Sequence, residues 1–225
     1  MVEVIVFAEG QTEEKFIKLV VAPNLKQLKV FLKPETLRTS TDAKGGAVNF
    51  DRLKFYARNT LRGKRDVVLS TFLDLYGLTT DFPKFEEAKQ KSSVYARASC
   101  LEDGLHEALI DQIGCQPDRF LPHIQPYEFE GLLFSDVEAL IGVEPTWKKS
   151  LSGLDEVRKA FDTPEHINDS YETKPSKRLE NMLQPKYHKT RHGPLAAERI
   201  TLPVIERECA HFRGWMDKLR GLAAS

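Results

Sequence analysis

The stretch that decides the fold is VIVFAEGQTEEKF, residues 4–16. It starts with apolar residues, reaches a carboxylate at Glu9 and continues through Gly10 into a polar segment. A short apolar run that ends at a turn residue is typical of a buried strand, and Gly10 lets the chain leave that strand sharply. A carboxylate beside a buried strand is costly unless a cation or hydrogen-bond donors compensate it. Glu9 is therefore either a helix-capping or surface acid, or part of a functional site.

The same pattern of apolar runs continues along the chain. We expect further strands at residues 28–33, 66–74 and 120–125, the last interrupted by Pro122. Amphipathic helical segments separate these runs. The alternation predicts an α/β fold of Rossmann-like type, with a mostly parallel sheet of about four strands flanked by helices.

Several helix boundaries also follow from the sequence. We expect Asn49 to cap a helix after the glycine-containing loop 41–49, and Ser99 with Glu102 to form a capping box before a helix that ends near residue 113. Residues 127–142 also have a helical pattern. In the first helix, Phe16, Leu19 and Val20 should share the buried face.

The chain length sets the domain organisation. A chain of 225 residues can form one sizeable core. We expect an α/β core over residues 1–143 and a helical C-terminal extension over residues 144–225, packed on that core. No apolar run approaches the ~18 residues of a membrane span and no leader of the signal-peptide type is visible, so we expect a cytoplasmic protein with no membrane partner.

The net charge of zero conceals an uneven distribution. Residues 26–65 carry 11 basic against 3 acidic residues, and residues 174–225 carry 11 against 5. Residues 66–173 between them carry 9 basic against 21 acidic residues. If the two basic segments converge, they would form a phosphate-binding rim around an acidic centre; the alternative is that they are solvated helix faces.

The cysteines and histidines give no sign of a zinc site. Cys100, Cys115 and Cys209 are far apart in the sequence and lack the spacing of a zinc site or a disulfide framework. His188 and His192 lie close together, but no Cys/His spacing accompanies them, and they are assigned no role.

Two acids follow predicted buried strands directly. Glu9 ends the first strand, and Asp74 ends DVVLSTFLD, residues 66–74. In a doubly wound sheet, ligands bind at the carboxyl ends of the strands, so both acids belong at that edge. Two carboxylates held together repel each other unless a divalent cation lies between them. Magnesium, with few carboxylate ligands and several waters, suits such a site.

A second pair of acids occurs in QPYEFEGLLFSD, residues 125–136. Glu128 and Glu130 follow the predicted fourth strand. On a helix, a spacing of two residues separates side chains by ~200°. We therefore expect only one of the two to face the site, unless the segment starts as a turn.

The motifs together resemble a known family. They are AEGQTEEKF (8–16), FLDLYGLTTDFP (72–83), RFLPHIQPYEFEGLLFSD (119–136), PSKRLENMLQPKYHK (175–189) and HFRGWMDKL (211–219). In this combination the chain is similar to a bacterial family known only as a domain of unknown function, number forty-two seventy-six, which is regarded as Toprim-like. The first strand and its glutamate resemble the Toprim domains of topoisomerases, primases and overcoming-lysogeny-defect nucleases. The resemblance implies a Toprim-like core.

The resemblance also implies a set of site residues. Glu9 matches the Toprim glutamate, and Asp74 matches the first aspartate of the Asp-x-Asp pair. The second aspartate falls on Tyr76, a poor magnesium ligand. Glu128, Glu130 and Asp81 are possible substitutes, and Glu130 is the first choice because it lies inside a family-like segment.

The resemblance further points to cations in the segment 175–189. Lys177, Arg178, Lys186 and Lys189 are candidate phosphate contacts, and a lysine such as Lys189 would stabilise charge on the phosphate. The alternative is a surface helix with extended basic side chains.

Two functional hypotheses follow. In the first, the protein is a nuclease in which Glu9, Asp74 and Glu130, with Glu128 nearby, bind Mg²⁺ or Mn²⁺ and hydrolyse DNA or RNA. The resemblance implies a partner ATPase in bacterial defence, which would be separately encoded because the chain has no GxxxxGK[ST] motif. In the second, the protein is a non-catalytic subunit that binds nucleic acid or regulates the ATPase. Small-molecule phosphate chemistry is a third possibility.

Overall fold

The structure is a computed structural model that describes residues 1–37, 48–64, 66–168 and 170–224. Most of the predicted loop 41–49 lies outside the described residues. No helix among the described residues is long and apolar enough to span a membrane.

A parallel sheet forms the centre of the fold, as the sequence predicts. Strand β1 (Val2–Ala8) pairs with β2 (Val30–Thr36) on one side and with β3 (Val67–Asp74) on the other. Beyond β3 lie two short strands, β4 (Phe120–Leu121) and β5 (Ile124–Gln125), both paired with β3. The interruption between them falls at Pro122, which cannot donate a ladder hydrogen bond.

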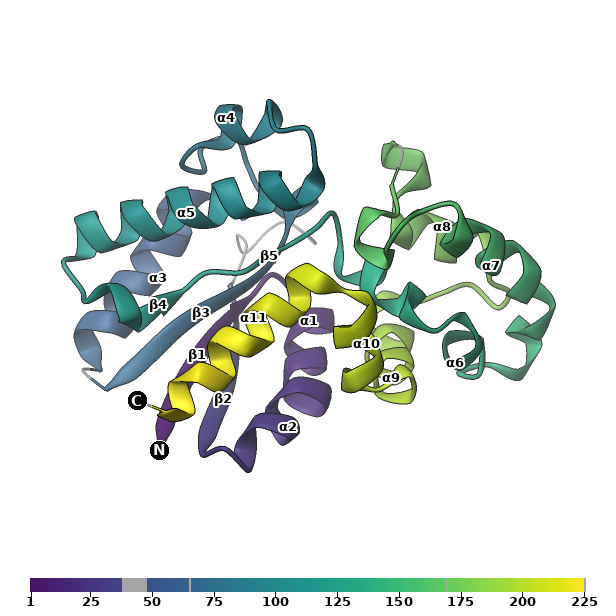
Figure 1. Ribbon diagram of the computed structural model, residues 1–225, viewed down its shortest axis with the longest axis horizontal. Helices are drawn as coiled ribbons and strands as arrows, with labels where there is room; N and C mark the ends of the chain where they lie inside the picture. The colour runs from purple at the N-terminus through teal and green to yellow at the C-terminus, as the bar shows by residue number, and fades with distance from the viewer. Residues whose placement is uncertain (38–47, 65, 169, 225) are drawn as a thin grey trace.

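Helices cover both faces of the sheet (Figure 1). On one face, Val4 and Val6 pack in an apolar cluster with Phe16 and Trp215, which come from the first helical segment and from the C-terminal helix. The side chains between them in the strands point to the opposite face and pack under two long helices. The helices on the first face are α1 (Gln11–Phe16), α2 (Ala22–Lys26) and α11 (Ala210–Gly221). The two long helices on the opposite face are α3 (Phe50–Gly63) and α5 (Val94–Ile113).

Another group of helices stands at the carboxyl end of the sheet (Figure 1). Its apolar residues, among them Trp147, Leu154 and Leu179, belong to the same cluster as Val4 of the central strand. These helices and the sheet therefore share one continuous apolar core. The remaining helices are α4 (Phe85–Lys89), α6 (Val137–Ile141), α7 (Leu151–Lys159), α8 (Pro175–Met182), α9 (Lys189–Ile200) and α10 (Leu202–Glu208).

Some helix starts differ from the prediction. Asn49 caps α3 as expected, by accepting a hydrogen bond from the backbone N–H of Arg52. The expected capping box at Ser99 is wrong: α5 begins earlier, and Ser93 caps it by accepting from the N–H of Ala96. Ser99 therefore lies inside the helix. Glu102 does not cap it and instead makes the interior contacts described below.

The first helix also departs from a regular period. Residues Ile17–Val21 form a π-helical turn between α1 and α2. A π turn inserts an extra residue and rotates the following side chains. Phe16 and Val20 are buried as predicted, but Leu19 is 49% exposed.

Candidate functional site: a buried acidic cluster at the carboxyl ends of the central strands

Glu9 and Asp74 meet where the two central strands end. Because β1 and β3 are parallel neighbours, their carboxyl ends lie at the same edge of the sheet. The backbone N–H of Asp74 donates to Oε2 of Glu9 at 3.2 Å. The absence of a side chain at Gly77 makes room for this arrangement, since an added Cβ there would lie 2.1 Å from the same Glu9 oxygen.

Glu128 and Glu130 both join this site, which is the outcome expected if the segment after the fourth strand starts as a turn. The segment after β5 is not an α-helix: Glu128 has extended backbone, and a 3₁₀ segment starts at Phe129. The two glutamates therefore reach the same cation, Lys189, whose Nζ lies 3.7 Å from Oε1 of Glu128 and 3.3 Å from Oε2 of Glu130. The N–H of Phe129 also donates to Oδ1 of Asp74 at 2.8 Å, which ties this segment to the strand end.

A fifth acid, Glu13, belongs to the cluster and was not among the predicted residues. It lies in α1, one helical turn after the end of β1, and only 8% of it is exposed. The negative charge of Glu13 raises the pKa of Asp74 and of Glu130, so Glu13 lies close enough to both to interact with them. In the sequence it stands among three acids within six residues, and nothing in that run indicates which one faces inward.

Two lysines provide the positive charge at the cluster. Lys189, at the start of α9, contacts Glu128 and Glu130 as described. Lys174, which precedes α8 and was not predicted, lies 2.7 Å from Oε1 of Glu128. The second oxygen of Glu128 accepts from the backbone N–H of Ser176 at the first turn of α8.

The other predicted cations make different contacts. Lys177 and Lys186 each lie 3.5 Å from Glu180, and Arg178 donates to the carbonyl of Thr173. In the other basic segment, Lys33, Lys54 and Lys64 pair with nearby acids at the surface. Such pairings also occur on solvated surfaces, so the phosphate contacts of Lys177, Arg178 and Lys186 stay a prediction.

The electrostatics of the cluster show an excess of negative charge. Burial raises the pKa of Glu13 and of Glu130 to about 7, and repulsion from neighbouring acids adds to it. Burial also raises the pKa of Glu9 and, strongly, that of Asp74, which the charge of Glu9 raises further. Glu128 differs: although burial opposes it, Lys189 and the contacts with Lys174 and Ser176 lower its pKa.

Neither Tyr76 nor Asp81 completes the acidic set. The phenol of Tyr76 accepts a hydrogen bond from Asn168 at 2.5 Å, and its ring lies 5.4 Å from that of Tyr127. Both carboxylate oxygens of Asp81 are used elsewhere, since one accepts from the N–H of Phe50 at 2.9 Å and the other from the Thr79 hydroxyl. Of the substitutes considered for the second aspartate, Glu128 and Glu130 are the ones at the site.

The donor set suits a hard divalent cation. Mg²⁺ and Mn²⁺ prefer carboxylate oxygens. In both Glu9 and Asp74, one carboxylate oxygen accepts a backbone hydrogen bond, and the other oxygen could bind a cation. The acids are not drawn tightly together. Among the described residues, the group of three His, Cys, Asp or Glu side chains with ligand atoms all within 4.8 Å is Glu102, His123 and His211. An ion at the acidic cluster would have to draw the carboxylates closer.

Comparison with known proteins identifies a family and nothing more specific. Neither a search of curated proteins nor a search of solved structures found a significant match. The motifs that surround the acidic cluster all lie within residues 8–220, and the family model described as "Domain of unknown function (DUF4276)" matches that range. The chain therefore belongs to the DUF4276 family.

Proposed function

We propose that the protein is a divalent-metal-dependent phosphodiester hydrolase that acts on DNA or RNA. The observation that supports this proposal is the cluster itself: five carboxyl groups meet two lysines at the carboxyl ends of the central strands, and most have a raised pKa. A divalent cation would compensate the excess of negative charge in the cluster, and a phosphate would then be attracted to the same place.

In this proposal each side chain has a defined task. Glu9 and Asp74 hold the Mg²⁺ or Mn²⁺ ion, with Glu130 or Glu128 beside them. The ion, when bound, would polarise the scissile phosphate and acidify a water molecule. Lys189 lies against Glu130 and would shift toward the negative charge that develops on the phosphate. Without an ion Glu130 has a pKa of about 7, and a bound dication would lower this pKa and hold Glu130 as a carboxylate ligand.

The partner assignments rest on the family resemblance and the charge distribution. Lys177, Arg178 and Lys186 would follow the nucleic-acid backbone away from the site, since they belong to the same basic segment as Lys189. A separately encoded ATPase would supply any nucleotide-driven step.

The test is cleavage by purified protein. Supercoiled DNA, single-stranded DNA and RNA are each incubated with Mg²⁺ or Mn²⁺. We expect wild type to cleave at least one substrate, and Asp74→Asn and Glu9→Gln to lose at least 100-fold of that rate. Asp136→Asn is the matched control, because Asp136 caps α6 outside the site and asparagine is an equally good cap. Equal rates in wild type and Asp74→Asn would refute the proposal.

A non-catalytic subunit is the second candidate. Tyr76 favours it, because a phenol held by Asn168 stands where the resemblance implies a carboxylate ligand. Thermal denaturation separates the two candidates. A rise in melting temperature with Mg²⁺ or Mn²⁺ that disappears in Asp74→Asn supports the hydrolase by linkage. No rise at millimolar metal, together with intact nucleic-acid binding, supports the subunit.

A further inference from the structure

A second cluster of polar side chains lies inside the molecule, apart from the acidic site. Glu102 comes from α5, His123 from the link between β4 and β5, and His211 from the first turn of α11. Glu102 and His123 are buried and the His211 side chain is 12% exposed. Figure 1 shows why these distant segments meet: α5 and α11 lie on opposite faces of the sheet, and only the short β4–β5 region separates them.

The three side chains converge on one carboxylate oxygen. Oε1 of Glu102 lies 2.8 Å from Nε2 of His211 and 3.5 Å from Nδ1 of His123. The same oxygen accepts from the backbone N–H of Ile124 at 2.8 Å, which fixes its position. One ligand atom from each side chain therefore lies within 4.8 Å of the other two.

Neighbouring residues determine which nitrogen of His123 carries its proton. The amide Nε2 of Gln125 donates to Oε1 of Glu165 at 3.3 Å, so the amide oxygen of Gln125 faces the other way. That oxygen lies 3.2 Å from Nε2 of His123 and can only accept, so Nε2 of the ring must carry the hydrogen. In the neutral ring, Nδ1 then presents a lone pair toward the Glu102 carboxylate.

Nδ1 of His123 can face the Glu102 carboxylate at 3.5 Å only with a proton or a metal ion between them. Metal sites solve this problem in a recognisable way: the second N–H of a ligating imidazole donates to a fixed acceptor, which orients the ring. Gln125 has this role for His123, and Glu165 in turn holds Gln125. Glu165 also accepts from the N–H groups of His211 and Phe212, which fixes the start of α11 and with it the second imidazole.

We propose that Glu102, His123 and His211 form a binding site for a divalent transition-metal ion of the zinc class. Two imidazoles and one carboxylate select such an ion over Mg²⁺, which prefers oxygen ligands. Three protein ligands leave a fourth tetrahedral position for water. Because the ligands come from α5, the β4–β5 link and α11, the ion would join the C-terminal helix to the sheet.

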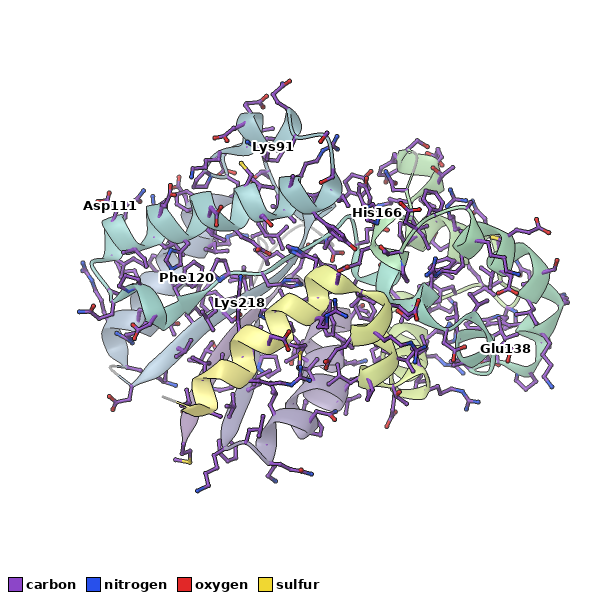
Figure 2. The ribbon with its side chains drawn as sticks, in the orientation of Figure 1. Lys91, Asp111, Phe120, Glu138, His166 and Lys218 are labelled. Carbon is purple, nitrogen blue, oxygen red and sulfur yellow. The ribbon has the colours of Figure 1, made fainter. Side chains whose placement is uncertain are left out.

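The site was not visible in the sequence. Its residues are far apart along the chain, and Glu102 stood at the spacing of a capping box with Ser99. Figure 2 shows His166 at the junction between α5 and the helical group. There, its Nδ1 lies 2.8 Å from the Thr163 hydroxyl, which is 3.0 Å from the hydroxyl of Tyr95. This chain of polar groups continues to Glu165, so the proposed site is embedded in a larger buried network.

The test uses Co²⁺, whose visible absorption reports its ligands. The purified 225-residue protein is stripped with chelator, dialysed into buffer with excess Mg²⁺ and titrated with Co²⁺ and then with Zn²⁺. We expect one equivalent of Co²⁺ to give the absorption of a four-coordinate site and Zn²⁺ to displace it. His211→Asn and Glu102→Gln should weaken binding at least 100-fold. No such spectrum with wild type would overturn the proposal.

Two control variants separate this site from other candidates. His188→Asn removes a histidine that contacts the ring of His192 just before α9, and Asp74→Asn disrupts the acidic cluster. Both should bind Co²⁺ as wild type does. Loss of the Co²⁺ spectrum in either one, with His211→Asn unaffected, would refute the assignment. If His211→Asn does not fold, pulsed EPR of Cu²⁺-loaded wild type decides: two coordinated imidazoles support the site, and none overturns it.

Discussion

At the scale of single residues, Lys189 is the cation that the acidic cluster shares. It lies within 3.7 Å of Glu128 and 3.3 Å of Glu130, and both carboxylates are buried. Its own pKa is raised, because the attraction of these acids outweighs the burial that opposes its charge. Removing this charge would leave the carboxylates with less compensation than they have now.

Lys189→Met should therefore destabilise the metal-free protein. Losing one partner of a fully buried ion pair costs about 3–5 kcal/mol, but the Lys189 side chain is 40% exposed, so we expect about 1–3 kcal/mol at pH 8. Urea denaturation measures the loss. Lys186→Met is the control, because Lys186 is 59% exposed and pairs with Glu180 at the surface, where less than about 1 kcal/mol is at stake. Equal losses in both variants would contradict this account of Lys189.

Gly77 controls the position of Glu9. An alanine there would place Cβ 2.1 Å from Oε2 of Glu9, so the carboxylate would have to leave its hydrogen bond with the N–H of Asp74. We expect Gly77→Ala to weaken Mn²⁺ binding at least tenfold, measured by calorimetric titration. Gly63→Ala serves as the control, since a Cβ at Gly63 would meet nothing within 4 Å. Unchanged Mn²⁺ affinity in Gly77→Ala would show that Glu9 is not a ligand.

The sequence revealed the part of the site that follows strand ends. Glu9 and Asp74 could be predicted because an acid directly after an apolar strand has an unusual environment whatever the rest of the fold does. Glu13, Lys174 and the histidine cluster could not, because their burial depends on contacts between segments far apart in the chain. Whether Glu128 and Glu130 would both face the site depended on the local backbone, which the sequence left open. An extended residue before a 3₁₀ turn lets both side chains reach the site, whereas an α-helix would separate them.

At the scale of secondary-structure elements, the long helix α5 shows how caps decide boundaries. Two serines precede possible first turns, Ser93 and Ser99, and the second has the glutamate of a capping box three residues later. The helix nevertheless starts at Val94, because Ser93 caps it and Glu102 makes interior contacts with the N–H of Ile124 and with His211. Tertiary contacts override the local motif here.

Alanine substitutions distinguish the two serines. Ser93→Ala removes the hydrogen bond to the N–H of Ala96 and should lower the free energy of unfolding by about 1 kcal/mol. Ser99→Ala replaces a residue inside the helix with the best helix former, and we expect a change of less than about 0.5 kcal/mol. Urea denaturation of both variants gives the comparison. If Ser99→Ala lowers the free energy of unfolding more than Ser93→Ala does, Ser99 and Glu102 form the capping box after all.

The strands were more predictable than the helices. The apolar run within residues 66–74 predicts a buried strand from its composition, and all eight residues of Val67–Asp74 are buried. The first helix was less predictable than the strands, because the π turn at Ile17–Val21 exposes Leu19 and no residue in the segment indicates such a turn. The second strand is shifted to Val30–Thr36 because pairing with β1, rather than composition, sets its ends.

At the scale of the whole molecule, a group of helices stands at the carboxyl end of the sheet (Figure 1), and the acidic cluster takes residues from both parts. The strands contribute Glu9 and Asp74, and the helical group contributes Lys174 and Lys189. Burial of so many acids in one place makes the stability of the whole fold depend on their protonation.

Metal-free protein should lose stability as the pH rises toward neutrality. Glu13 and Glu130 each have a pKa of about 7 in the fold, against 4.5 for the ordinary group. The folded state therefore holds more protons than the unfolded state between these values. Its extra stability is complete below about pH 4.5 and is lost as the pH rises through 7. For two coupled carboxyls we expect a loss on the order of 2–4 kcal/mol between pH 5 and 8.

Glutamine variants isolate this contribution from that of other titrating groups. The amide of Glu130→Gln has nearly the shape of a protonated carboxyl, so the variant should match wild type near pH 5 and exceed its free energy of unfolding at pH 8 in chelator. Urea denaturation across this range measures the difference. Glu138→Gln, in the first turn of α6, is the control and should leave the pH dependence unchanged. If Mg²⁺ or Mn²⁺ binds the cluster, adding it at pH 8 should restore the stability of wild type, because the ion then supplies the charge that protons supply at low pH. A flat wild-type profile in chelator would mean that these carboxyls are not buried together in solution.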